Sequence, residues 1–129
     1  MNAYLLFVYN ANAGYWNGVM DSLHKIFSPK TYPCSLCAIT YGLRKIEPDW
    51  DAFIKSELQA FEPQFLHKDE LIEEFGEAVL EQHALPAVFW VDKDSKLLDP
   101  IIPKEKMDQL SLDELKDELR KIIAKLENK

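Results

Sequence analysis

Two short runs of the chain are apolar at every position and are bounded by polar or turn-forming residues. The first run covers 4–9 and the second covers 87–91. Runs of this length that are rich in aromatic and β-branched side chains are typical of buried strands. Polar residues at 92–96 then predict a hairpin turn, with the partner strand beginning at 97–98. A third, shorter strand is expected at 64–66.

Five further segments carry apolar residues at the spacing that is typical of amphipathic helices. These helices are expected at 15–27, 34–41, 48–61, 69–83 and 112–126. Asp69 is the predicted N-cap of the fourth helix, and Gly42 is the predicted stop of the second. The last helix is the clearest, since Ser111 and Glu114 have the spacing of a capping box. Its apolar stripe consists of Leu112, Leu115, Leu119, Ile122 and Leu126.

The order of these elements predicts a mixed α/β fold, with a central mixed sheet of about four strands flanked by helices. At 129 residues the chain has the length of one compact domain, and it contains no repeat or long linker that would divide it. Apolar residues make up 47% of the chain and charged residues 29%, which are values of globular proteins. We therefore expect a single domain over 1–129.

The charge of the chain limits its partners. The formal net charge is -7 and the isoelectric point is near 4.9, whereas nucleic acids and anionic membrane surfaces are bound by clustered lysine and arginine. The N-terminal segment has no basic region, and no apolar stretch approaches the length of a membrane span. We expect a cytoplasmic protein that binds neither nucleic acid nor membrane, while the sequence does not indicate an oligomeric state.

The only two cysteines of the chain are separated by two residues, in Cys34-Ser35-Leu36-Cys37. One turn of helix brings two such sulfurs within reach of a disulfide, and two thiolates can also supply half of a tetrahedral metal site. A reducing cytosol does not favour a purely structural disulfide, so the pair points to redox exchange or to metal binding. A third interpretation is that both cysteines only pack as small residues of the helix.

In the redox interpretation Cys34 is the nucleophile, because a sulfur in the first helical turn lies near unpaired backbone N–H groups, and Cys37 resolves the mixed disulfide. This role needs a thiol or disulfide protein as partner and no cofactor. In the metal interpretation His24, on the preceding predicted helix, joins the two cysteines. Zinc would then need a fourth ligand, such as His67, His83 or a carboxylate, whereas copper(I) would suit the thiolates alone.

The order of elements resembles the thioredoxin-like fold: strand, helix, CxxC segment, helix, strand, helix, hairpin and final helix. In that family a cis proline directly precedes the strand that begins the hairpin, and it faces the dithiol across the substrate groove. Pro86, in Leu85-Pro86-Ala87-Val88, matches that position. The family's CxxC immediately follows the first strand, whereas here 10–16 take that place and the cysteines come one helix later. Either the CxxC segment folds back beside Pro86, or the dithiol lies elsewhere.

Residues 24–37 are also similar to a small uncharacterised bacterial family that is sometimes labelled GTPase. The chain has no GxxxxGK[ST] motif, which would cradle a phosphate. The cysteine spacing favours thiol-disulfide oxidoreductase chemistry through Cys34 and Cys37, and the thioredoxin-like resemblance implies that Pro86 shapes the groove of this site. The alternatives are a zinc or copper module that uses Cys34, Cys37 and His24, and a non-catalytic interaction protein that keeps the thioredoxin-like fold.

Overall fold

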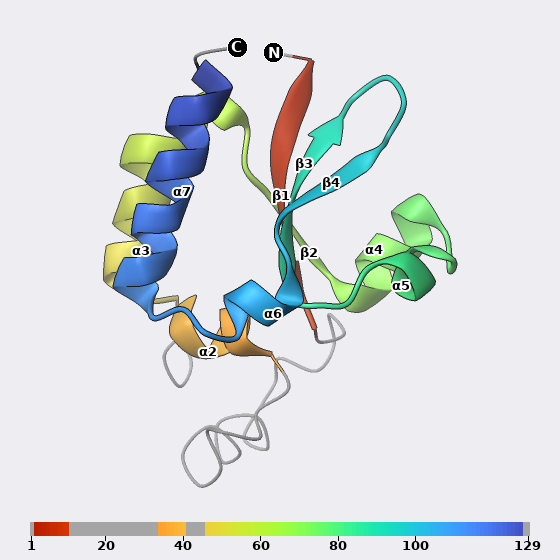
Figure 1. Cartoon of the computed structure of the whole chain (residues 1–129), viewed down its shortest axis with the longest axis horizontal. Helices are drawn as coiled ribbons and strands as arrows, with labels where there is room; N and C mark the ends of the chain where they lie inside the picture. Colours follow the sequence, from red (N-terminus) through yellow and green to blue (C-terminus); the bar gives the residue numbers. More distant parts are fainter. Residues whose placement is uncertain (1, 11–33, 41–45, 128–129) are drawn as a thin grey trace, which may run out of the picture.

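The computed structural model of the chain describes residues 2–10, 34–40 and 46–127. Four strands form one sheet: β1 (Ala3–Tyr9), β2 (Gln64–His67), β3 (Ala87–Asp92) and β4 (Leu98–Ile102). Their order is β2-β1-β3-β4. Strand β1 is parallel to β2 and antiparallel to β3, and β3 is antiparallel to β4. The predicted mixed sheet of four strands flanked by helices is thus confirmed (Figure 1).

The central strand β1 is apolar throughout because both of its faces are buried. Leu5, Phe7 and Tyr9 belong to one core cluster, which also contains both cysteines, and we call this side of the sheet the cysteine face. Leu6 and Val8, at the alternate positions, belong to a second cluster on the opposite side, which we call the α4 face. The continuous apolar run in the sequence therefore marks the centre of the sheet.

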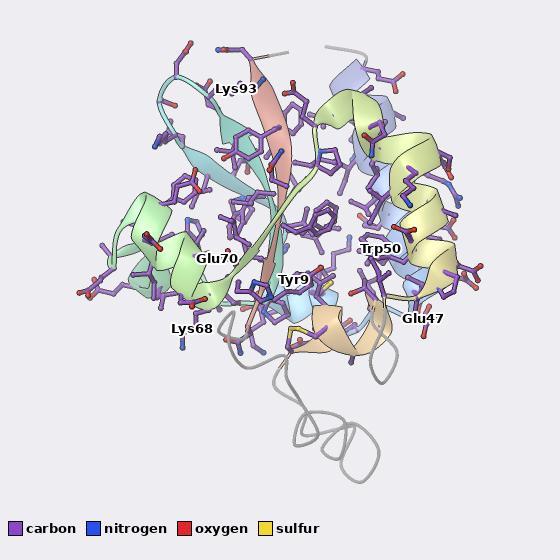
Figure 2. All side chains as sticks on the ribbon, turned by 180° about the vertical axis from the view of Figure 1, so that it is seen from behind. Tyr9, Glu47, Trp50, Lys68, Glu70 and Lys93 are labelled. Atoms are coloured by element: carbon purple, nitrogen blue, oxygen red, sulfur yellow. A yellow bond between two sulfur atoms is a disulfide. The ribbon has the colours of Figure 1, made fainter. Side chains whose placement is uncertain are left out.

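Among the described residues, four α-helices contribute to the cysteine face: α2 (Ser35–Thr40), α3 (Pro48–Phe53), α6 (Lys104–Met107) and α7 (Leu112–Glu127). Beyond α3 the chain continues through a π-helical turn (Ile54–Leu58) and a 3-10 turn (Gln59–Phe61), so the helical segment predicted at 48–61 is confirmed. Figures 1 and 2 show α3 and α7 side by side along the sheet. These two helices shield most of this face.

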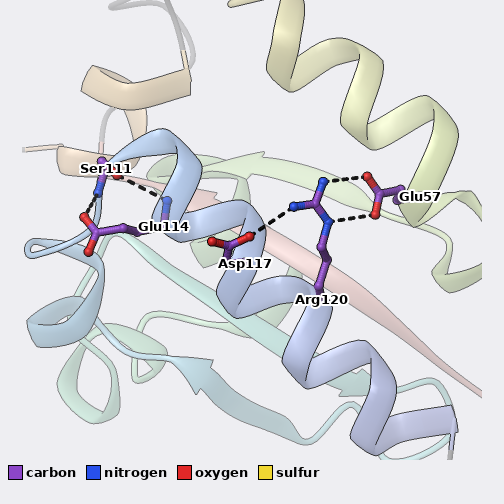
Figure 3. A network of polar contacts seen from close by, with 5 residues as sticks. All are labelled: Glu57, Ser111, Glu114, Asp117 and Arg120. Carbon is purple, nitrogen blue, oxygen red and sulfur yellow. Dashed lines mark hydrogen bonds and ion pairs between the residues drawn. The ribbon is translucent and has the colours of Figure 1, made fainter.

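The long helix α7 begins at the predicted capping box. The backbone N–H of Ser111 donates to Glu114 Oε1 (3.0 Å), and the backbone N–H of Glu114 donates to Ser111 Oγ (3.2 Å), as Figure 3 shows. The buried residues of α7 are Leu115, Leu119 and Ile123. Leu112, Ile122 and Leu126 are partly buried against the same cluster, so the predicted apolar stripe is confirmed, and Ile123 is a further buried position that was not predicted.

A bidentate ion pair joins α7 to the helical segment that follows α3. Arg120 donates from Nε and Nη2 to the two carboxylate oxygens of Glu57, each at 2.9 Å, and from Nη1 to Asp117 at 3.1 Å (Figure 3). The hydrogen bond with Glu57 raises the pKa of Arg120, and the same contact lowers the pKa of Glu57. This pair fixes the outer edge of the two-helix layer.

The described helices of the α4 face are short: α4 (Lys68–Phe75) and α5 (Val79–Gln82). The single helix predicted over 69–83 is wrong, because the chain turns at Gly76 with φ of 94°, a backbone conformation that glycine adopts readily. The N-cap of α4 is His67, not Asp69 as predicted. Among the residues that the structure describes, these two short helices are the ones that pack on this face (Figure 1).

Two other features differ from the predictions. Strand β4 extends to Ile102 and includes Pro100, which an edge strand accepts because one side of its backbone makes no ladder bonds. The short helix α6 was not predicted. The helix expected at 15–27 and the helix stop expected at Gly42 lie outside the described residues.

Candidate functional site

Cys34 and Cys37 form a disulfide, with an S–S distance of 2.03 Å and a Cα–Cα distance of 5.2 Å. Helix α2 produces this geometry, because a spacing of three residues returns the chain to the same side after one turn. The predicted helix at the CxxC is confirmed, with Cys34 directly before its first residue. The backbone carbonyl of Cys34 accepts the N–H of Ala38 at 3.0 Å, which closes the first turn.

The sulfur of Cys34 accepts two backbone hydrogen bonds. One comes from the N–H of Cys37 and the other from the N–H of Asn10, both at 3.3 Å. Asn10 directly follows β1, so the second bond places the CxxC at the end of the central strand. Figure 2 shows the disulfide next to Tyr9, the last residue of β1. When the disulfide is reduced, the same two N–H groups can stabilise a thiolate on Cys34.

Both cysteines are part of the core. Cys34 is 1% exposed and Cys37 is 0% exposed, and they share their cluster with Leu36, between them in the sequence, and with Met107 of α6. A partner thiol cannot reach a sulfur in this arrangement unless the packing around the disulfide opens locally. Exchange at this disulfide therefore depends on the packing around it.

Pro86 is buried, and the Leu85–Pro86 peptide bond is cis. In the antiparallel register Ala87 pairs with Val8, so Pro86 lies one residue beyond that pair, toward the end of β1 where Asn10 follows. Asn10 contacts Cys34 through its N–H. The end of β1 is thus bordered by Pro86 on the β3 side and by the disulfide on the cysteine face.

A histidine and a carboxylate lie at the same end of the sheet. His67 ends β2 and pairs in register with Tyr9, and the two ring centroids are 5.5 Å apart. The carboxylate of Glu70 accepts the backbone N–H of His67 at 2.8 Å and lies 2.6 Å from Nδ1 of its ring. These two hydrogen bonds lower the pKa of Glu70.

The sequence interpretation missed one polar contact of the CxxC segment. Ser35 Oγ donates to Asp108 Oδ1 at 2.7 Å, and Lys104 Nζ donates to the other oxygen of Asp108 at 2.6 Å. Burial alone would raise the pKa of Asp108, but the hydrogen bonds from Lys104 and Ser35 lower it. Ser35 and Asp108 are 73 positions apart, so no local motif could have indicated this contact.

The predicted metal ligands are brought together only in part. Cys34 and Cys37 share a bond to each other, and His24 lies outside the described residues. Within the ranges 2–10, 34–40 and 46–127, no group of three or more histidine, cysteine, aspartate or glutamate side chains could hold a metal ion. His67 is paired with Glu70, and the ring of His83 packs edge-on against Phe89 on the α4 face, with centroids 5.1 Å apart.

A cavity of about 470 Å³ lies on the α4 face, over β1 and β2. Tyr4, Leu6 and Leu66 line it from the sheet, and Glu74 lines it from α4. Burial, together with the nearby carboxylate of Glu74, raises the pKa of Tyr4. Of the described residues that were predicted to carry chemistry, which are Cys34, Cys37 and Pro86, none lines this cavity.

Comparison of the chain with models of known protein families, with curated proteins and with solved structures gives no match. Among the described helices, none is both long enough and apolar enough to span a membrane.

Proposed function

We propose that this protein is a thiol-disulfide oxidoreductase with a thioredoxin-like fold, and that Cys34 and Cys37 carry its chemistry. The observation that supports this most directly is the disulfide itself, formed by the only two cysteines of the chain and bonded through Asn10 to the end of β1. Two cysteines at this spacing can alternate between disulfide and dithiol, and here the exchange needs local opening because both sulfurs are buried.

The arrangement around the disulfide supports the thioredoxin-like part of the proposal. In the sequence, the cysteines come one helix later than the resemblance implies. In space, Cys34 contacts the N–H of Asn10, the residue that directly follows the first strand. The cis Leu85–Pro86 bond precedes β3, at the position that the resemblance implies, and borders the same strand end. The contact of the CxxC segment with the end of the first strand is compatible with the position that the resemblance implies for the motif.

The proposed reaction conserves atoms and electrons. The thiolate of Cys34 attacks a disulfide of a partner protein, an S–S bond forms between Cys34 and the partner, and the partner's second sulfur leaves as a thiolate. The thiolate of Cys37 then attacks Cys34 Sγ, closes the internal disulfide and releases the first partner sulfur. Two electrons and two protons pass from this chain to the partner, and the reverse sequence oxidises a partner dithiol.

The test is equilibration of the untagged protein in glutathione buffers, read by intact mass. We expect the chain to gain two hydrogens reversibly as the buffer crosses the cytosolic range of roughly −220 to −320 mV. In Cys37→Ser, Cys34 should accumulate a stable mixed disulfide with glutathione, because the resolving sulfur is absent. The matched variant Cys34→Ser should accumulate less, because Cys37 is not the attacking sulfur.

Three results would contradict the proposal. A disulfide that stays closed across the whole range of potentials would leave the pair without an exchange role. Equal glutathione adducts in the two serine variants would remove the distinction between the cysteines. Native mass spectrometry that finds a metal on the reduced protein, and loses it in Cys34→Ser and in His24→Ala, would favour the zinc or copper interpretation instead.

A further inference from the structure

The residue that follows Cys34 is held by a carboxylate from a different part of the chain. Ser35 Oγ donates to Asp108 at 2.7 Å, and Asp108 directly follows α6. Asp108 also forms an ion pair with Lys104, one turn earlier, at 2.6 Å. Met107, the neighbour of Asp108, is 0% exposed and lies in the same cluster as the disulfide. This anchored segment therefore fixes a pair of opposite charges against the first turn of α2.

The charges of this pair act differently on the two redox states. A disulfide carries no charge, whereas reduction creates a thiolate on the cysteine that reacts. A carboxylate nearby disfavours that thiolate and an ammonium favours it. The carboxylate of Asp108 accepts a hydrogen bond from the residue that follows Cys34, whereas Lys104 contacts the other oxygen of the same carboxylate and reaches the CxxC segment only through it.

We propose that Asp108 is a positioning residue that holds Ser35 and, together with Lys104, sets how strongly the reduced state of Cys34 is favoured. This inference rests on the proposed redox function. The Asp108 charge acts against reduction and makes the dithiol a stronger reductant, while Lys104 offsets part of that effect. The pair thus adjusts the reactivity of the site without touching either sulfur.

Two other acidic residues, Glu70 and Glu47, lie at the ends of elements in this part of the described structure. Glu70 is bonded to His67 between β2 and α4. Glu47 lies where α3 begins, and its backbone N–H binds the carbonyl of Thr40 at the end of α2. These groups remain unchanged in the variants described below, so they contribute equally to each measurement.

The test compares Asp108→Asn with Lys104→Gln, because the two changes break the same ion pair but leave opposite charges. Asp108→Asn should shift the glutathione equilibrium about threefold toward the dithiol and speed alkylation of reduced Cys34 by iodoacetamide at pH 7 about threefold. Lys104→Gln should shift both quantities in the opposite direction. Tandem mass spectrometry of the tryptic peptide 31–44 separates alkylation at Cys34 from alkylation at Cys37.

The ion pair of Glu62 with Lys93 is the matched control. This ion pair lies at the other end of the sheet (Figure 2). Lys93 directly follows β3, and its backbone N–H donates to the backbone carbonyl of Asn2, which precedes β1. Glu62→Gln and Lys93→Gln change the net charge by the same amounts as the test variants. We expect neither to shift the equilibrium or the alkylation rate, because the charges lie beyond the range of effective interaction in salt.

The outcomes separate this inference from the proposed function. If Asp108→Asn and Lys104→Gln shift the glutathione equilibrium in the same direction, or if neither shifts it, the role of Asp108 is overturned. The proposed redox function would still stand in that case, provided that the wild-type disulfide is reversible. Equal shifts in the control pair would show a general effect of net charge and would also overturn the role of Asp108. If the wild-type disulfide cannot be reduced in the folded protein, both proposals fail.

The part assigned to Ser35 is tested in a Ser35→Ala background. There the shift of the glutathione equilibrium caused by Asp108→Asn should become smaller, and an undiminished shift would overturn the role of Ser35.

Discussion

The two faces of the central sheet are covered in different ways. On the cysteine face, α3 and α7 run side by side along the strands, and both sulfurs belong to the same buried cluster as their apolar side chains. On the α4 face the described helices are short, and a cavity of about 470 Å³ opens beside Glu74. One face therefore combines both sulfurs with close packing, and the described part of the other face offers space without a cysteine. Within the described residues, the packing that encloses the disulfide therefore belongs to the cysteine face.

Substitutions of one buried leucine on each face give the strongest test of this difference. Leu119 of α7 and Leu71 of α4 are both 0% exposed, and each change to alanine should lower the free energy of unfolding by about 2–5 kcal/mol. Urea unfolding measures that loss. Both variants should be reduced faster by a phosphine in proportion to their loss of stability. Only Leu119→Ala should exceed that proportion, because the cavity left by the leucine lies in the cluster that contains both sulfurs.

The outcome also distinguishes two routes of reduction. If the two leucine variants, compared at equal stability, are reduced at equal rates, then the disulfide opens through global unfolding. In that case the packing of the cysteine face would not control the rate of disulfide reduction, and the two faces would not differ in their effect on that rate. A difference between the variants would instead indicate local opening around α2.

The helix that covers the cysteine face depends on a cap that can be removed separately. Ser111→Ala deletes the oxygen that accepts the N–H of Glu114 at 3.2 Å, and the expected cost is about 1 kcal/mol of unfolding free energy. Lys121→Gln, an exposed change on the same helix, is the control and should leave the urea midpoint almost unchanged. An unchanged midpoint in Ser111→Ala would mean that the cap does not contribute to the stability of α7.

The features that the sequence predicted are those encoded by neighbouring residues. The apolar run of β1, the box at Ser111 and Glu114 and the spacing of Cys34 and Cys37 all act over one or two turns or one strand, so their patterns can be read directly. The break between α4 and α5 was missed because apolar residues continue the helical period on both sides of Gly76. A backbone turn there interrupts a pattern that by itself favours one helix.

The candidate site was predictable in its sulfurs but not in its surroundings. The N–H of Asn10 reaches Cys34 across 24 positions, and Asp108 reaches Ser35 across 73. Such contacts arise when separate elements pack around a common core, and no local spacing encodes them. Asp108 also looks like an ordinary surface acid in the sequence, because its partner is a serine that carries no signal of its own.

The smallest expected effect on stability comes from the capping contact at the start of α4, which is the counterpart on the α4 face of the capping box of α7. The pKa of Glu70 is lowered from 4.5 in the folded state by hydrogen bonds with His67, first from the backbone and then from the side chain. A carboxylate whose folded-state pKa is depressed stabilises the fold above about pH 4.5, and this contribution disappears as the pH falls through the folded-state value. Glu70 is 42% exposed in its side chain, so solvent screens the effect and the contribution is small.

Glu70→Gln should therefore weaken the dependence of the urea midpoint on pH below about 4.5, while at pH 7 the amide oxygen can still accept the N–H of His67. Glu73→Gln, which removes an exposed carboxylate from the same helix outside this contact, should keep the wild-type slope. Equal slopes in the two variants would show that the His67 contact does not distinguish Glu70 from an ordinary surface acid. A reduced slope in Glu70→Gln alone would mean that a glutamate carboxylate stabilises the first turn of α4, as Glu114 caps α7 on the other face. The two faces would then differ in the packing of side chains above the sheet and not in how their helices begin.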